Sequence, residues 1–278
     1  MKLAFSSNAY LNYSFSEAAR RIANAGYSGI EIMADVPHAW PAYLLPEQKA
    51  AIREQLELNR LQISNVNAFM MNAINDHRQK YWHPSWIEPY QPYRQVRIDH
   101  TMRALDLAKE LGAPCITTEP GGPLEPGQTF EQGLELFCEN LLPVADHAKS
   151  IGVPLLIEPE PGLLIETAAQ YERFAKVFNH AGIGLNFDIG HMYCVNDDPA
   201  TAIRQLAKHI RHVHLEDIAA TRVHHHLVPG VGAIDFVPVI SALKEIGYLG
   251  WITIELYPYI DNPDQAATTA FKAISKLL

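Results

Sequence analysis

The sequence predicts a closed (β/α)8 barrel, and three observations lead to this fold class. Short apolar segments alternate with longer amphipathic ones along all 278 residues. Eight short segments begin between residues 2 and 250, so their mean repeat is about 35 residues, the length of one βα unit. The turn after the first segment lacks the glycine-rich phosphate loop typical of an open doubly wound sheet. Because no change in composition divides the chain, we expect one barrel domain over residues 1–278 and no nucleotide cofactor.

Strands are expected where short runs of apolar and β-branched residues occur. These runs cover residues 2–6, 29–33, 62–67, 114–119, 154–158, 183–188, 210–216 and 250–255. Amphipathic stretches separate them, such as residues 99–113, in which Met102, Leu105 and Ala108 recur on one helical face. Gly112 then stands where a helix commonly ends, because glycine accepts the left-handed conformation.

One connection is longer than a βα turn requires. Residues 68–93 follow the third predicted strand, and a connection of this length is usually functional or disordered. Its many Tyr and Trp residues favour an ordered segment, because aromatic rings can bury a large apolar area. We expect this connection to form a lid over one end of the barrel. The alternative is an Ω-loop that packs against the barrel and has only a structural role.

Composition limits the classes of function. Hydrophobic residues make up 48% and charged residues 19% of the chain, so a large core is expected and disorder is not. The net charge of -9 argues against nucleic acid as a partner, and no apolar run approaches the ~20 residues of a membrane helix. Three cysteines without CxxC spacing argue against a disulfide scaffold or a thiolate metal site. We expect a cytoplasmic protein. The sequence allows a homo-oligomer but does not decide the oligomeric state.

Polar residues stand at the ends of the last four predicted strands, where barrel enzymes carry their sites. Side-chain alternation points Glu158, Asp188, His214 and Glu255 toward the barrel interior. A single Glu or His at such a position is commonly neutralised by a neighbouring Arg or Lys. Three carboxylates and one imidazole that converge would repel one another without a cation. This ligand set suits Mn2+, Mg2+, Co2+ or Zn2+, with positions open to substrate or water.

Seven segments spread over nearly the whole chain together resemble the xylose-isomerase-like TIM barrel superfamily. They are AGYSGIEI (25–32), LAKELGAPCITTEPGG (107–122), GVPLLIEPEPG (152–162), GLNFDIGHMY (184–193), IRHVHLED (210–217), VPGVGAIDF (228–236) and YLGWITIELY (248–257). The superfamily includes sugar epimerases, hydroxypyruvate isomerases, inosose dehydratases and the AP endonuclease family 2 branch. The resemblance implies that Glu158, Asp188, His214 and Glu255 bind the metal, and that Glu158 and Glu255 also move protons.

The activity we expect is a metal-dependent isomerisation or epimerisation of a polyhydroxy carbonyl compound such as a sugar. A bound divalent cation polarises the carbonyl and acidifies the adjacent C–H. Glu158 and Glu255 could then remove and return a proton through an enediolate. The first alternative is a metal-dependent dehydratase of the inosose or dehydroshikimate type. A phosphodiesterase like the AP endonucleases is less favoured.

Further histidines lie close to the predicted ligands in the sequence. His191 follows Asp188 by three residues, and His224 and His226 lie in the loop after the seventh strand. Resemblance to the AP endonuclease branch implies a second metal on these histidines, and three imidazoles suit Zn2+. Contact with substrate, or no role, is the alternative. That branch has two further histidine ligands where this chain has Asn67 and Glu119, which argues against a three-metal centre.

Several other residues are candidate substrate contacts: Asn67, Glu119, Arg222, Trp82 and Trp86. The first two end strands, the arginine approximately matches one in the tagatose-type epimerases, and the tryptophans could pack on the apolar face of a sugar. Glu160 and His212 lie two residues from predicted ligands, and we expect them to orient those ligands. We expect Glu31 to belong to a hydrogen-bonded barrel interior.

Overall fold

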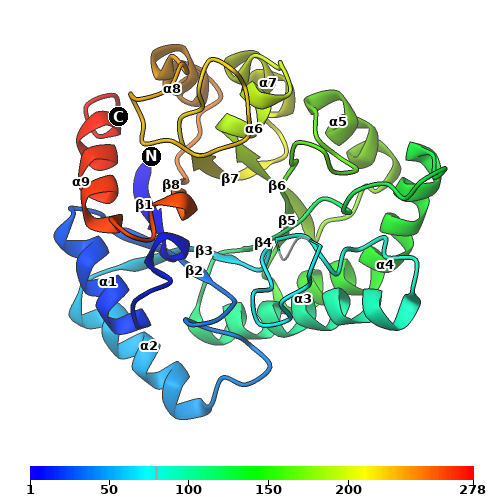
Figure 1. Ribbon diagram of the computed structural model, residues 1–278, viewed down its shortest axis with the longest axis horizontal. Coiled ribbons are helices and arrows are strands. Elements are labelled where there is room, and N and C mark those ends of the chain that lie inside the picture. Colours follow the sequence, from blue (N-terminus) through cyan, green and yellow to red (C-terminus); the bar gives the residue numbers. More distant parts are fainter. Residues whose placement is uncertain (79–80) are drawn as a thin grey trace.

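The computed structural model describes residues 1–78 and 81–278, and in this part of the chain eight parallel strands close into a barrel in chain order (Figure 1). The strands are β1 (Lys2–Ser6), β2 (Gly29–Met33), β3 (Gln62–Asn67), β4 (Ile116–Thr118), β5 (Leu155–Ile157), β6 (Ile183–Asp188), β7 (Ile210–Leu215) and β8 (Trp251–Ile254). β8 closes the barrel by pairing with β1, for example Trp251 with Lys2. The predicted fold class is confirmed, and each strand begins and ends within two residues of its expected bounds.

Helices surround the barrel on its outside (Figure 1). They are α1 (Phe15–Asn24), α2 (Pro46–Leu58), α3 (Gln91–Leu111), α4 (Phe130–Ile151), α5 (Ala168–Val177), α6 (Ile189–Cys194), α7 (Pro199–Leu206), α8 (Phe236–Glu245) and α9 (Pro263–Ile274), with 3-10 turns η1 (Ser7–Tyr10) and η2 (Tyr257–Tyr259). Ser14, Thr129 and Thr167 cap α1, α4 and α5 by accepting a backbone N–H in the first turn. Gly112 ends α3 in the left-handed conformation with φ 75°, as its position predicted.

Strand register places the predicted ligands side by side at the carboxyl end of the barrel. Asp188 on β6 pairs with His214 on β7, and His214 pairs with Thr253 on β8, two residues before Glu255. Side chains alternate along a strand, so these positions point toward the barrel axis while Phe187, Val213 and Ile254 face the helices. The polar site is therefore built on rigid strand ends.

The long connection after β3 is shorter than expected, because α3 begins at Gln91 and already includes residues 91–93. The remaining connection spans residues 68–90, of which 79 and 80 lie outside the described residues. Phe69, Met70 and Tyr81 from this connection line a cavity at the carboxyl end of the barrel. This part of the connection therefore lies at the end of the barrel where a lid was expected, and a lid function stays a prediction.

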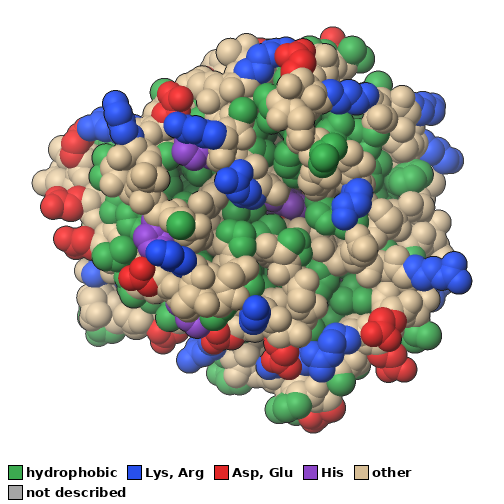
Figure 2. Space-filling view, turned by 180° about the vertical axis from the view of Figure 1, so that it is seen from behind, with side chains coloured by type: hydrophobic (Ala, Val, Ile, Leu, Met, Phe, Trp, Pro, Cys, Tyr) green, Lys and Arg blue, Asp and Glu red, His purple; other side chains and the backbone are tan. Residues whose placement is uncertain are grey.

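The face seen in Figure 2 carries Lys and Arg side chains toward its middle, while Asp and Glu lie mainly toward its edge. Apolar side chains are exposed between these charges. Within the described residues, no helix has the length and apolar character needed to cross a membrane.

Candidate metal centre and active site

Four buried side chains meet at the carboxyl ends of β5 to β8. Glu158, Asp188, His214 and Glu255 each place one ligand atom within 4.8 Å of the others. His214 Nδ1 lies 2.9 Å from Glu158 Oε1, 3.8 Å from Glu255 Oε2 and 3.9 Å from Asp188 Oδ2. Among the described residues, no Lys or Arg forms an ion pair with these carboxylates. The three carboxylates therefore share one imidazole, which is the arrangement that a divalent cation stabilises.

Hydrogen bonding supports the fit of a cation to this site. Asp188 Oδ2 is buried and has no hydrogen-bond donor among the described residues, whereas Asp188 Oδ1 accepts the backbone N–H of His191 at 2.7 Å. An unpaired carboxylate oxygen in the interior is costly unless a cation or proton binds it. Its neighbours Glu158 and Glu255 face the same point. The donor set of three oxygens and one nitrogen suits a divalent metal.

Burial and mutual repulsion set the protonation of the cluster. Burial, together with repulsion from Glu158, raises the pKa of Glu255 well above its usual range. Burial lowers the pKa of His214, but the carboxylates of Glu158, Glu31 and Glu255 outweigh it and hold this pKa well above its usual range. The site thus takes up positive charge, as protons or as a cation.

Glu31 fixes the orientation of the His214 ring. His214 Nε2 lies 2.6 Å from Glu31 Oε2, and Glu31 also accepts hydrogen bonds from Asn65 at 2.8 Å and Asn67 at 3.4 Å. With Nε2 bonded to Glu31, Nδ1 faces the other three predicted ligands. Such a carboxylate behind a histidine ligand sets its tautomer and increases its basicity. The expectation of a hydrogen-bonded barrel interior at Glu31 is confirmed.

Amides hold the two glutamates, and most of these donors were not predicted. Asn186 Nδ2 donates to Glu158 Oε2 at 2.9 Å. Asn8 and Asn67 donate to Glu255 Oε1 at 2.9 Å and 3.2 Å. Asn186 could have been found from the sequence, because it lies two residues before Asp188 on the same face of the strand. Asn8 follows β1, which carries no predicted ligand, so no local signal pointed to it.

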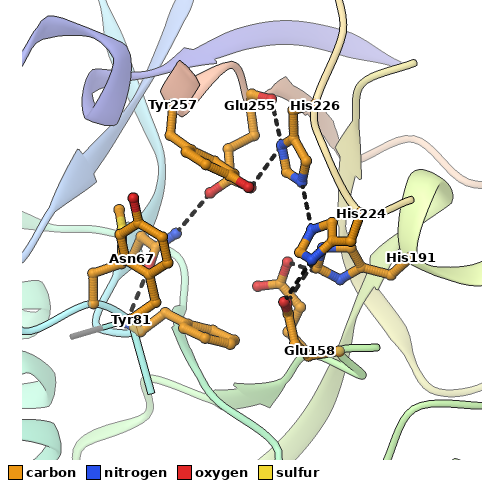
Figure 3. A pocket seen from close by; sticks show the side chains of 11 residues that line it. Asn67, Tyr81, Glu158, His191, His224, His226, Glu255 and Tyr257 are labelled. Carbon is orange, nitrogen blue, oxygen red and sulfur yellow. Dashed lines mark hydrogen bonds and ion pairs between the residues drawn. The ribbon is translucent and has the colours of Figure 1, made fainter. Parts of the chain in front are cut away.

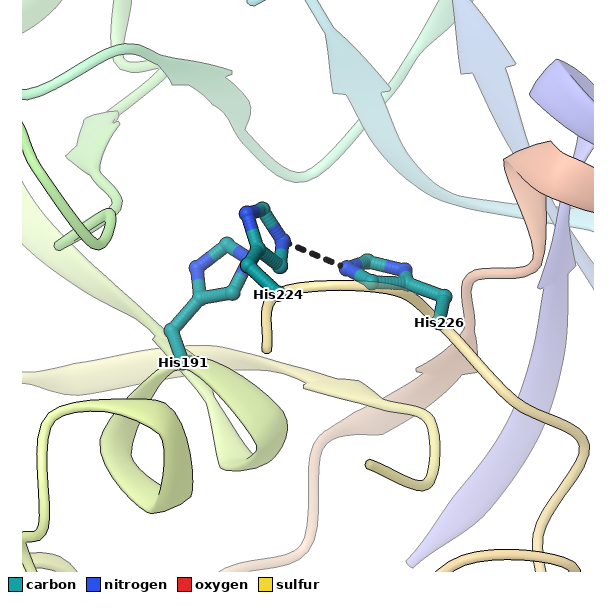
Figure 4. A group of neighbouring side chains, drawn as sticks. All are labelled: His191, His224 and His226. Carbon is teal, nitrogen blue, oxygen red and sulfur yellow. Dashed lines mark hydrogen bonds between the residues drawn. The ribbon is translucent and has the colours of Figure 1, made fainter. Parts of the chain in front are cut away.

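Three histidines form a second cluster (Figure 4), and it lies close to Glu158 and Glu255. His191, His224 and His226 each place one ring nitrogen within 4.8 Å of the others. Nδ1 of His191 lies 2.8 Å from the Pro159 carbonyl, and Nδ1 of His226 lies 2.9 Å from the Glu255 carbonyl. A carbonyl can only accept, so both Nδ1 atoms carry the proton and a neutral ring has a bare Nε2. The structure therefore brings the three together, and a second metal there stays a prediction.

Glu160 and Asp217 support this cluster. Glu160 Oε1 lies 3.1 Å from His224 Nδ1, and Glu160 Oε2 lies 3.3 Å from His191 Nε2. Asp217 accepts backbone N–H groups of Ile218, Gly230, Gly232 and Ile234, at 2.8 to 3.0 Å. These hydrogen bonds restrain the loop that carries His224 and His226. His212 instead lies 3.8 Å from Glu31 with its Nε2 unbonded, so its expected orienting role is not seen.

A cavity opens over both clusters (Figure 3). Its empty volume is about 380 Å3, including the part open to solvent. It is lined by Asn67, Phe69, Met70, Tyr81, Glu158, Glu160, His191, His224, His226, Glu255 and Tyr257. The carboxylates and histidines form its polar side, and the aromatic residues and Met70 form an apolar side.

Four of the expected substrate contacts do not line this cavity: Glu119, Arg222, Trp82 and Trp86. Trp86 is fully buried, packs edge-on against Phe137 and donates its indole N–H to Thr118. Glu119 accepts the backbone N–H groups of Trp86 at 2.9 Å and Gly121 at 2.6 Å. Arg222 bonds the Tyr193 carbonyl and stacks on the Tyr193 ring. Internal packing and loop structure therefore use Glu119, Arg222 and Trp86, and only Asn67 of the five lines the cavity.

Comparison with known proteins places these features in context. The model of the xylose isomerase-like TIM barrel family matches residues 19–277. An inosose dehydratase of Clostridium beijerinckii is 25% identical over 293 residues, which cover 94% of this chain and 89% of that protein. An inosose dehydratase of Lacticaseibacillus casei is 24% identical, with 93% and 88% covered.

Solved structures share the fold. A D-tagatose 3-epimerase-like protein has a TM-score of 0.83 and 24% identity, with 100% of this chain and 97% of that chain covered. The IOLI protein, whose structure contains a zinc atom, has a TM-score of 0.81 and 22% identity, with 100% and 98% covered. The two chains thus resemble the present one over their whole barrels.

Proposed function

We propose that this chain, which belongs to the xylose isomerase-like TIM barrel family, is a divalent-metal-dependent dehydratase of a polyhydroxy ketone. One observation carries the proposal: the cavity is lined by the acid–base groups Glu160 and His224 as well as by two of the four predicted metal ligands, Glu158 and Glu255. An elimination needs such a group, because the departing hydroxyl requires a proton. The inosose dehydratases among the relatives favour this reaction type over the isomerisation that the sequence first suggested.

Glu158, Asp188, His214 and Glu255 would hold the cation, which when bound supplies polarisation of the substrate ketone. Glu158 and Glu255, on two sides of this site, are positioned to take a proton from the carbon next to the ketone. The electron pair of that C–H bond forms a C=C bond, and the C–O bond on the next carbon breaks. Burial raises the pKa of Glu160 to about 8, so this carboxyl can give its proton to His224 Nδ1 while His224 passes its Nε2 proton to the departing hydroxide, which leaves as water.

The test uses inosose and protein loaded with Mn2+, Co2+, Zn2+ or Mg2+. We expect the product to lose the mass of one water and to gain near-ultraviolet absorbance, because a conjugated system forms. His224→Ala should lower kcat about 10²–10⁴-fold, the usual contribution of a general acid. Neither a mass change nor an absorbance change in any metal form would contradict the dehydratase proposal.

An isomerase or epimerase is the second candidate. The two glutamates that flank one predicted metal site favour it, since removal and return of a proton need a base on each side of the carbon. This reaction would conserve mass and incorporate solvent deuterium at the carbon next to the carbonyl. We do not favour a phosphodiesterase, because the net charge is -9 and the cavity is small.

The three-histidine cluster carries a further proposal, a second cation on His191, His224 and His226. Because Nδ1 of His191 and Nδ1 of His226 each bond a backbone carbonyl, their Nε2 atoms are the ones left to bind a metal, and this supports the proposal. A metal on His224 would prevent this histidine from donating a proton. The number of metal ions per chain therefore decides between the two roles.

A further inference from the structure

We propose that Tyr81 and Tyr257 form an aromatic wall that selects a ring-shaped substrate over an open-chain one, with Tyr81 as the specificity-determining residue. This inference rests on the proposed function, because it specifies the substrate class of the same site. It concerns binding, however, and can be tested with compounds that do not react.

The two tyrosines lie together on the apolar side of the cavity (Figure 3). Their ring centroids are 5.5 Å apart and their planes are inclined by 59°. Tyr257 also contacts the His226 ring, with centroids 4.6 Å apart. Phe69 and Met70 extend the same side. The cavity thus has an apolar wall facing a polar one that contains Glu158 and the histidines.

This division matches the chemistry of a cyclic polyol. In such a ring the hydroxyl groups project mainly from the edge, and the C–H bonds give each face apolar character. A ring face packed on the tyrosines leaves the ring edge to reach the carboxylates and histidines. An open-chain polyol has no persistent apolar face, and it also loses more conformational entropy on binding. The wall therefore favours the ring.

Buried charged groups fix the segment that carries Tyr81. Arg97, on α3, is fully buried and donates to the carbonyl oxygens of Ala68 at 3.0 Å and Pro84 at 2.9 Å, one on each side of Tyr81. Glu119, after β4, accepts the backbone N–H of Trp86 at 2.9 Å.

Asp35, after β2, holds the same segment at its other end. Its carboxylate accepts the backbone N–H groups of Asn72 and Ala73. The barrel therefore holds residues 68–73 and 84–86, which precede and follow Tyr81, by charge-assisted hydrogen bonds, which are stronger than neutral ones. A wall held in this way can discriminate by shape.

The sequence suggested other aromatic residues for packing on the apolar face of a substrate ring. Trp82 and Trp86 were expected to pack on a sugar, but Trp86 is in the core and Trp82 does not line the cavity. Tyr81 is in the same connection as the two tryptophans. Tyr257 lies just after β8, two residues beyond the predicted ligand Glu255. The structure thus places two tyrosines, and neither of the two expected tryptophans, at the cavity.

The experiment measures binding of myo-inositol, a ring, and sorbitol, an open-chain polyol with as many hydroxyl groups, to the metal-loaded protein by calorimetry. We expect the wild type to bind myo-inositol at least tenfold more tightly than sorbitol. Tyr81→Ala should bring this ratio close to one, whereas Tyr81→Phe should keep it because the ring face is retained. Tyr43→Ala is the control, since Tyr43 is 81% exposed and does not line the cavity.

Three results would overturn the inference. They are an unchanged ratio in Tyr81→Ala, the absence of a ring preference in the wild type, and no binding of either polyol. Circular dichroism of each variant shows whether it is folded. A protein that prefers the ring but does not dehydrate inosose would contradict the proposed reaction and leave the aromatic wall standing.

Discussion

Replacing Glu158 or Glu255 with Gln is expected to lower kcat at least about 10³-fold while the barrel stays folded. Each carboxylate is both a predicted metal ligand and a predicted base, and loss of a general base alone costs about 10²–10⁴-fold. Gln keeps the size of the side chain and removes one charge from a buried cluster of like charges. The free energy of unfolding of the protein without metal should therefore not fall. Steady-state kinetics and thermal unfolding measure the two effects.

Glu135→Gln is the matched control. Glu135 lies on α4, is exposed and does not line the cavity, so kcat should not change. Metal analysis of each variant separates loss of the ion from loss of the base. Turnover within tenfold of the wild type in both Glu158→Gln and Glu255→Gln would contradict their assignment.

Removing the divalent metal with a chelator should abolish activity and lower the melting temperature, and adding metal back should restore both. Without the ion, three carboxylates share one imidazole, so their repulsion favours unfolding. A ligand that binds only the native state at about 1,000 times its Kd stabilises the protein by about 4 kcal/mol. Full turnover by protein shown to be free of metal would contradict the metal-dependent reaction.

Two variants refine this experiment. Glu31→Gln should weaken metal binding about 10–100-fold, because the carboxylate behind His214 orients it. A metal content of two ions per chain that falls to one in His226→Ala would support the second cation site. One ion in both proteins would leave His224 free to donate a proton.

Local patterns in the sequence predicted the barrel and the positions of the four ligands. Side-chain alternation is a property of the strand itself, so Asp188 and His214 could be assigned to the interior without knowing the fold in detail. The strand order then brings the four ends together, because consecutive strands are neighbours in this barrel. Whether the four bind metal is still a prediction.

The rest of the site depends on the conformations of the loops that connect the strands. Glu119 and Trp86 had the residue types of a substrate contact, but they bond to each other through the Trp86 backbone N–H. Tyr81 lies next to Trp82 in the sequence, and nothing local distinguishes the one that lines the cavity from the one that does not. Asn8 reaches Glu255 from the far end of the chain. Such contacts are set by tertiary structure and carry no periodic signal.

The most direct measurement is anomalous diffraction from a crystal of the protein supplied with Zn2+. We expect a peak at the carboxyl end of the barrel, with Glu158, Asp188, His214 and Glu255 about 2.0–2.2 Å from the ion. A map without a peak among these four side chains, although zinc is present in the crystal, would contradict the metal centre on which the proposed chemistry depends.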